Sequence, residues 1–90
     1  MGPGEIVGAL EELRRGLPWV ERFDVELGDD AMGEPAVFLR VVVRSGEAEL
    51  FEDGERLGDA RWKLREALAG AGVGLWPYID FVSADELEAA

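Results

Sequence analysis

Hydrophobic residues recur along this chain with a helical period in two segments. The first segment spans about residues 4 to 15, where an apolar stripe consists of Ile6, Val7, Leu10, Leu13 and Leu17. Gly16 and Pro18 are expected to end this helix. The second segment spans about residues 53 to 71, with Asp53 as the expected N-cap. Its stripe consists of Leu57, Ala60, Leu64, Ala67, Leu68 and Ala71.

Three other segments have the alternation or the composition of β-strands. In residues 19–27, WVERFDVEL, the predicted inner face holds Trp19, Phe23, Val25 and Leu27, and the predicted outer face holds Val20, Arg22, Asp24 and Glu26. Residues 36–44, AVFLRVVVR, are rich in β-branched side chains, and residues 75–82, LWPYIDFV, predict a last strand. Residues 47–51 are compatible with a loop or a helical turn, and residues 83–86 predict the start of a short terminal helix.

This order of elements predicts an α+β fold of the αββαβ type, formed by one domain over residues 1–90. We expect a two-layer sandwich in which a three-stranded sheet carries both helices on one face. The first two strands should form an antiparallel hairpin. A right-handed crossover through the second helix should then place the last strand parallel to the second strand. The order of the strands in the sheet stays open.

Composition excludes several classes of function. The chain has no cysteine and no histidine, so it lacks thiolate ligands and the commonest general base and zinc ligand. Its formal net charge of -11 disfavours nucleic acid and anionic membrane surfaces as partners. It contains neither a basic, signal-like start nor ~18 consecutive apolar residues. We therefore expect a cytoplasmic protein that is not an enzyme and that needs no metal or cofactor.

The acidic segment LGDDAMGEP, residues 27–35, raises the question of a metal or catalytic loop. Asp29, Asp30 and Glu34 carry oxygen ligands that suit a hard cation, but the regular spacing of an EF-hand loop is missing. Turn-forming residues fill the segment, and it joins two predicted strands. The sequence favours a hairpin turn over a weak cation site, and either of these over catalysis.

The more informative anomaly is a set of aromatic and basic residues on faces that the predicted core does not use. At ~100° per residue, Trp62 falls nearly opposite the apolar stripe of its helix. On the strands, the face away from the helices carries aromatics and arginines, and exposed apolar patches of this kind typically mark interaction surfaces. The predicted interaction surface consists of Phe38, Arg40, Val42, Trp62, Trp76 and Tyr78.

Several occupants fit such a surface. A second copy of the chain is favoured, which predicts a homodimer, and a different protein comes next; the acidic charge favours a basic partner. The C-terminal segment is an alternative cover for the sheet. Single-stranded nucleic acid is disfavoured by charge, although aromatic sheet faces with arginines do stack bases.

Two segments resemble known families. Residues 29–43, DDAMGEPAVFLRVVV, and 76–87, WPYIDFVSADEL, look like the signature of a family of small uncharacterised bacterial proteins; in it a Gly-acid-Pro-Ala-Val step enters the second strand and Trp-Pro-Tyr enters the last. This resemblance implies no activity.

The order of elements also resembles the KH-like fold of ribosome-binding factor A, with residues 77–81, PYIDF, in the place of its last strand. That resemblance implies an RNA- or ribosome-associated role. The chain departs from the family in its acidic charge, and no binding residues are carried over. The sequence thus predicts a non-catalytic protein–protein interaction module, with a KH-like RNA-associated protein as the alternative.

Overall fold

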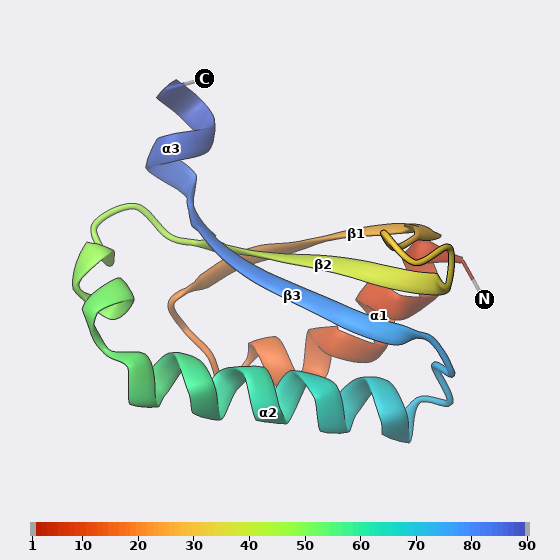
Figure 1. Ribbon diagram of the computed structural model, residues 1–90. Coiled ribbons are helices and arrows are strands. Elements are labelled where there is room, and N and C mark those ends of the chain that lie inside the picture. Colours follow the sequence, from red (N-terminus) through yellow and green to blue (C-terminus); the bar gives the residue numbers. More distant parts are fainter. Residues whose placement is uncertain (1, 90) are drawn as a thin grey trace.

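The protein forms a three-stranded mixed sheet with its two long helices on one face (Figure 1). The computed structural model describes residues 2–89. The elements in chain order are α1 (Pro3–Arg14), β1 (Val20–Asp29), β2 (Pro35–Val43), the 3-10 helix η1 (Ala48–Glu52), α2 (Gly54–Gly70), β3 (Trp76–Ser83) and α3 (Ala84–Ala89). The predicted α+β class is confirmed, and the ambiguous segment at residues 47–51 is mostly η1.

The strand order is β1–β2–β3, so β2 is the central strand and β3 is an edge. β1 runs antiparallel to β2, as a hairpin requires, and β3 runs parallel to β2 after the crossover through α2. Both pairings agree with the prediction, and the structure supplies the order that the sequence left open.

The core fills the space between the sheet and the two helices. Each helix contributes the buried positions of its apolar stripe, Ile6 and Leu10 from α1 and Ala60, Leu64 and Leu68 from α2. The sheet contributes alternate positions of its covered face, because side chains along a strand point to opposite faces. These are Phe23, Val37, Leu39, Val41, Val43 and Ile79.

The first residues of β1 depart from the predicted alternation. Val20 was expected on the outer face, but it is almost fully buried, as is its neighbour Trp19. The register between β1 and β2 shifts between Val20 and Arg22, as at a β-bulge. An extra residue at such a shift breaks the strict alternation of sides, which lets two consecutive side chains be buried.

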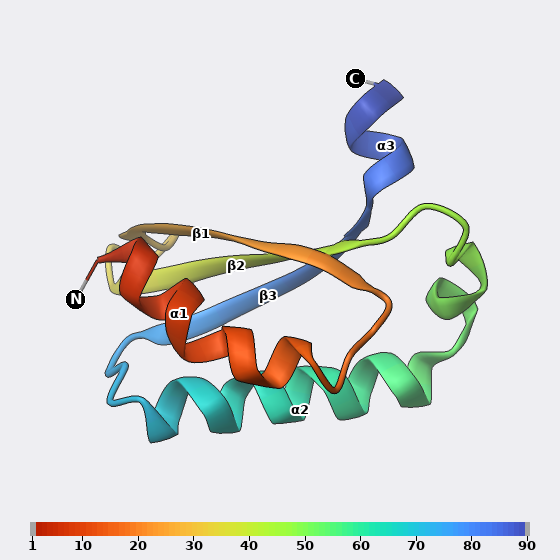
Figure 2. The same ribbon diagram turned by 180° about the vertical axis from the view of Figure 1, so that it is seen from behind.

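The ends of α2 and α3 are fixed by side-chain hydrogen bonds. The Asp53 carboxylate accepts a hydrogen bond of 3.1 Å from the backbone N–H of Arg56, which confirms the predicted N-cap. Ser45 Oγ donates to the Asp85 carboxylate over 2.7 Å and ties α3 to the loop after β2. Both views show α3 leaving the sheet on the side away from α1 and α2 (Figures 1 and 2).

Among residues 2–89, no helix has the length and apolar character to cross a membrane.

Candidate interaction surface on the open face of the sheet

The side of the sheet away from the helices carries a patterned set of side chains, which we call the open face. Two neighbouring cross-strand rows define it. In the first row Glu26, Phe38 and Tyr78 lie next to one another on β1, β2 and β3. In the second row the neighbours are Asp24, Arg40 and Asp80. An aromatic pair with one carboxylate therefore lies beside an arginine that has an aspartate on each neighbouring strand.

The rings of Phe38 and Tyr78 form a stacked pair. Their centroids are 5.4 Å apart and their planes differ by 16°. Tyr78 is 41% exposed. Phe38 packs beside Gly28 of β1, where a Cβ would lie 3.7 Å from Phe38 Cε2. Gly28 and the Phe38 ring are therefore close neighbours, and the aromatic pair presents part of its surface to the outside.

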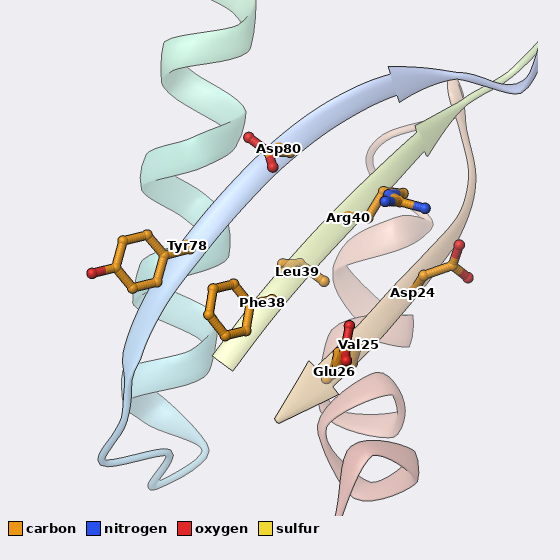
Figure 3. A pocket seen from close by; sticks show the side chains of 8 residues that line it. All are labelled: Asp24, Val25, Glu26, Phe38, Leu39, Arg40, Tyr78 and Asp80. Carbon is orange, nitrogen blue, oxygen red and sulfur yellow. The ribbon is translucent and has the colours of Figure 1, made fainter. Parts of the chain in front are cut away.

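A depression of about 500 Å³ is centred on this face (Figure 3). Carboxylates outnumber cations in its lining, which includes Asp24, Glu26, Asp80 and Arg40. In Figure 3 the Arg40 side chain extends toward β1, where Asp24 lies. Asp24 itself pairs with Arg22 at 3.1 Å. Within residues 2–89, Arg40, Glu26 and Asp80 form no ion pair, so two carboxylates flank the aromatic pair without a cationic partner.

The acidic segment between β1 and β2 is a turn, and Asp30 organises it. One oxygen of Asp30, Oδ1, accepts hydrogen bonds from the backbone N–H groups of Met32 and Glu34 at 2.9 and 3.0 Å. The other oxygen, Oδ2, accepts a bond of 2.9 Å from the Tyr78 hydroxyl. Both carboxylate oxygens are thus used by the fold. Among the described residues, no group of three or more acidic side chains is placed to hold a metal ion.

The contact between Asp30 and Tyr78 shifts both ionisations. The backbone N–H of Glu34 is the largest cause that lowers the pKa of Asp30, and the Tyr78 hydroxyl and the N–H of Met32 add to it. The pKa of Tyr78 is raised, chiefly because its hydroxyl donates to the Asp30 carboxylate. The hydrogen bond therefore holds Tyr78 in its protonated form and fixes one ring of the aromatic pair against the turn.

Tyr78 also borders a second depression, of about 520 Å³, between the turn and the start of β3. Its lining includes Asp30, Glu34 and Trp76. Trp76 is 61% exposed, and the guanidinium of Arg65 on α2 lies 6.0 Å from its ring centroid. Aromatic surface therefore continues from the open face to the edge of the sheet.

The structure brings together four of the six residues predicted to form the interaction surface. Phe38, Arg40, Tyr78 and Trp76 lie on the open face or at its edge. Trp62 is exposed, but it lies on α2, in the layer behind the sheet.

Val42 was also predicted on this surface, and that prediction is corrected, because the side chain is fully buried. Val42 lies on the central strand between Arg22 and Val82, at the end of the sheet where α3 stands on this side (Figure 1). Val42 has a neighbour on each adjacent strand, and none of its surface is exposed.

Sequence reasoning missed the bond between Asp30 and Tyr78 and the place of Arg65 over Trp76. The first two residues are 48 positions apart. Hydrophobic periodicity carries no signal for contacts between polar groups of different elements. A signal was present only in the turn, because the side chain of an Asp in a turn commonly accepts a hydrogen bond from the backbone N–H two residues on, as Asp30 does from Met32.

Comparisons of the chain with protein-family models, with curated proteins and with solved structures give no match.

Proposed function

We propose that this protein is a small, non-catalytic protein–protein interaction module, and that the open face binds its partner. The observation that carries the proposal is the stacked Phe38–Tyr78 pair, which lies partly exposed on the sheet face that α1 and α2 do not cover. Aromatic side chains with polar tips, surrounded by charged groups, are typical of interaction surfaces.

The proposal of a non-catalytic role rests on the chemistry that the chain offers. Histidine and cysteine are absent from the sequence. Asp30 and Tyr78, whose pKa values are shifted, are hydrogen-bonded to each other, Asp30 in the turn and Tyr78 on β3. The depression on the open face is open to the outside, and Glu26 and Asp80 in its lining are exposed, which suits contact with a partner better than enclosure of a substrate. The absence of cysteine also fits a cytoplasmic location, because no disulfide has to form.

We further propose that two copies associate through the outer side of α2, around Trp62. Trp62 is 62% exposed. α2 carries three acidic and four basic side chains, so it is nearly neutral in a chain whose net charge is -11. Because like charges repel, two copies meet with the least repulsion at their most neutral surface.

The second candidate is an RNA- or ribosome-associated KH-like protein. The order of elements, helix, strand, strand, helix, strand, favours it. Charge opposes it, because phosphate binding depends on clustered Lys and Arg, and the open face holds more carboxylates than cations.

The test is affinity capture from a lysate of the organism that encodes the protein, with wild type, Tyr78→Ala and Trp62→Ala as baits at low and moderate salt. We expect a protein that wild type and Trp62→Ala retain and Tyr78→Ala loses, and the purified pair should form the same complex. Equal retention by all three baits would contradict the proposal. Retained RNA or ribosomes would favour the second candidate.

The homodimer is tested separately by sedimentation velocity. Wild type should populate a dimer, and Trp62→Ala should shift the protein to monomer. A wild-type protein that stays monomeric at high concentration would refute the dimer without affecting the proposed role of the open face.

A further inference from the structure

We propose that the partner presents an extended basic segment with arginine side chains, and that a guanidinium of this segment lies on the Phe38–Tyr78 pair between Glu26 and Asp80. This inference rests on the proposed function, because it names the class of partner for the same open face. It goes beyond that proposal in naming the side chain that is recognised and the groups that recognise it.

The aromatic pair supplies the surface for a planar cation. Guanidinium groups stack on aromatic faces and are attracted by the negative charge of the ring face. The protein already contains this contact twice, since Arg61 lies 5.4 Å from the Phe81 centroid and Arg65 lies 6.0 Å from the Trp76 centroid. Within the described residues the Phe38–Tyr78 pair has no such arginine over it.

The charges around the pair set the sign of the partner. Glu26 is the cross-strand neighbour of Phe38, and Asp80 lies two residues beyond Tyr78 on β3. Neither carboxylate has an ion-pair partner among residues 2–89. Arg40, the cation of this face, extends toward β1 and leaves the Asp80 side open (Figure 3). A carboxylate accepts two parallel hydrogen bonds from a guanidinium, which favours arginine over lysine.

The shape of the surface favours an extended segment over a single side chain. Tyr78 borders both the depression on the open face and the second depression beside the turn. The second depression adds the carboxylate of Glu34 and the negative charge of Asp30, whose two oxygens already accept hydrogen bonds from the turn and Tyr78. Alternate side chains of an extended chain point the same way. A segment that crosses Tyr78 can therefore place one basic side chain on each side of its ring.

Charge also decides between competing occupants. Nucleic acid and anionic lipid would meet these carboxylates with like charge. A second copy would bring a further net charge of -11, with its basic side chains on α2 interspersed among acidic ones. A basic segment of another protein is the occupant with a complementary charge.

The test is an NMR titration of the ¹⁵N-labelled full chain with a blocked peptide of three arginines separated by glycines. Its matched probe replaces each arginine by citrulline, which keeps the shape and removes the charge. We expect backbone shifts at residues 24–26, 38–40 and 78–80 with the arginine peptide and none with the citrulline peptide. Phe38→Leu, which keeps an apolar side chain, should weaken binding about two- to fivefold, the size of an exposed cation–π contact.

Two double variants with the same change in charge distinguish a specific site on the open face from attraction by the net negative charge of the protein. Glu26→Gln with Asp80→Asn removes two carboxylates from the open face, and Glu55→Gln with Glu66→Gln removes two from α2. The first pair should weaken peptide binding more than the second. Equal weakening by both pairs, shifts that map to α2, or equal binding of citrulline would overturn the inference.

The outcomes also distinguish this inference from the proposed function. If the arginine peptide fails to bind while Tyr78→Ala still abolishes capture of a purified protein partner, the open face is an interaction surface and the inferred chemistry of its partner is wrong. If both experiments fail, the proposed function falls together with the inference.

Discussion

Tyr78 is the only tyrosine in the sequence, so its ionisation can be measured without interference from another phenol. Its hydroxyl donates to Asp30, and this raises its pKa above the usual 10.0. We predict that tyrosinate absorbance in the folded protein titrates with a midpoint above 10.0. Asp30→Asn should return the midpoint toward 10.0, because the amide carries no charge that favours the neutral phenol.

Asp29→Asn is the matched control, because Asp29 neighbours Asp30 and makes no hydrogen bond to Tyr78. It should leave the midpoint unchanged. A midpoint that is the same in wild type and in Asp30→Asn would show that the bond does not form in solution.

The same contact limits the pH range over which it stabilises the fold. The pKa of Tyr78 is raised, so its contribution is complete below the unfolded value near 10.0 and is lost as pH rises through the folded pKa. The pKa of Asp30 is lowered, so its contribution is present above the unfolded value near 3.8 and is lost as pH falls through the folded pKa. The link between turn and sheet is therefore fully formed between these limits.

α2 offers two large side chains on opposite sides of one helix. Leu64 is fully buried in the core, whereas Trp62 is exposed. We predict that Leu64→Ala lowers the free energy of unfolding by about 2–5 kcal/mol, because the truncation leaves a cavity. Trp62→Ala should change it by less than about 0.5 kcal/mol, as at other exposed positions. Denaturant unfolding of dilute protein, where association is negligible, measures both.

A large loss of stability for Trp62→Ala in dilute protein would contradict the exposed position. It would also weaken the use of that variant as a test for the dimer.

The start of α2 gives a prediction of intermediate size. Asp53 caps the helix through the backbone N–H of Arg56. Asp53→Ala should cost about 0.5–2 kcal/mol of stability in the same unfolding experiment. Asp53→Asn keeps an oxygen that accepts the bond and should cost less. An equal loss of stability for the two substitutions would show that the negative charge of Asp53, and not its hydrogen bond to the helix end, stabilises the fold.

The elements were predictable because their burial is periodic. The stripe from Leu57 to Leu68 identified α2, and the alternation of 76–82 placed Trp76 and Tyr78 opposite Ile79 and Phe81. The strand order was not predictable. A sheet with β3 next to β2 and a sheet with β3 next to β1 would bury the same side chains of each strand. Val20 was misplaced because a register shift changes the side of a residue without changing composition. Four members of the predicted surface lie together, whereas Val42 is fully buried on the central strand between Arg22 and Val82.

At the scale of the whole molecule, charge links the two proposed associations and gives them opposite responses to salt. The molecule measures 34 × 28 × 23 Å. Screening acts over about 30 Å at 0.01 M salt and about 8 Å at 0.15 M. At low salt each charge is thus felt across the whole protein, and at physiological salt only nearby charges count.

Two copies that meet at α2 repel each other through the acidic remainder of the chain, and an arginine segment on the open face is attracted by it. We predict that added salt raises the dimer fraction in sedimentation velocity and weakens binding of the arginine peptide in the NMR titration. The two slopes should have opposite signs. If added salt dissociated the dimer as well, the two copies would be held together by pairs of opposite charges. Such pairs could form between α2 of one copy and the open face of the other. The arginine peptide would then compete with the dimer, and the two surfaces would form a single interface.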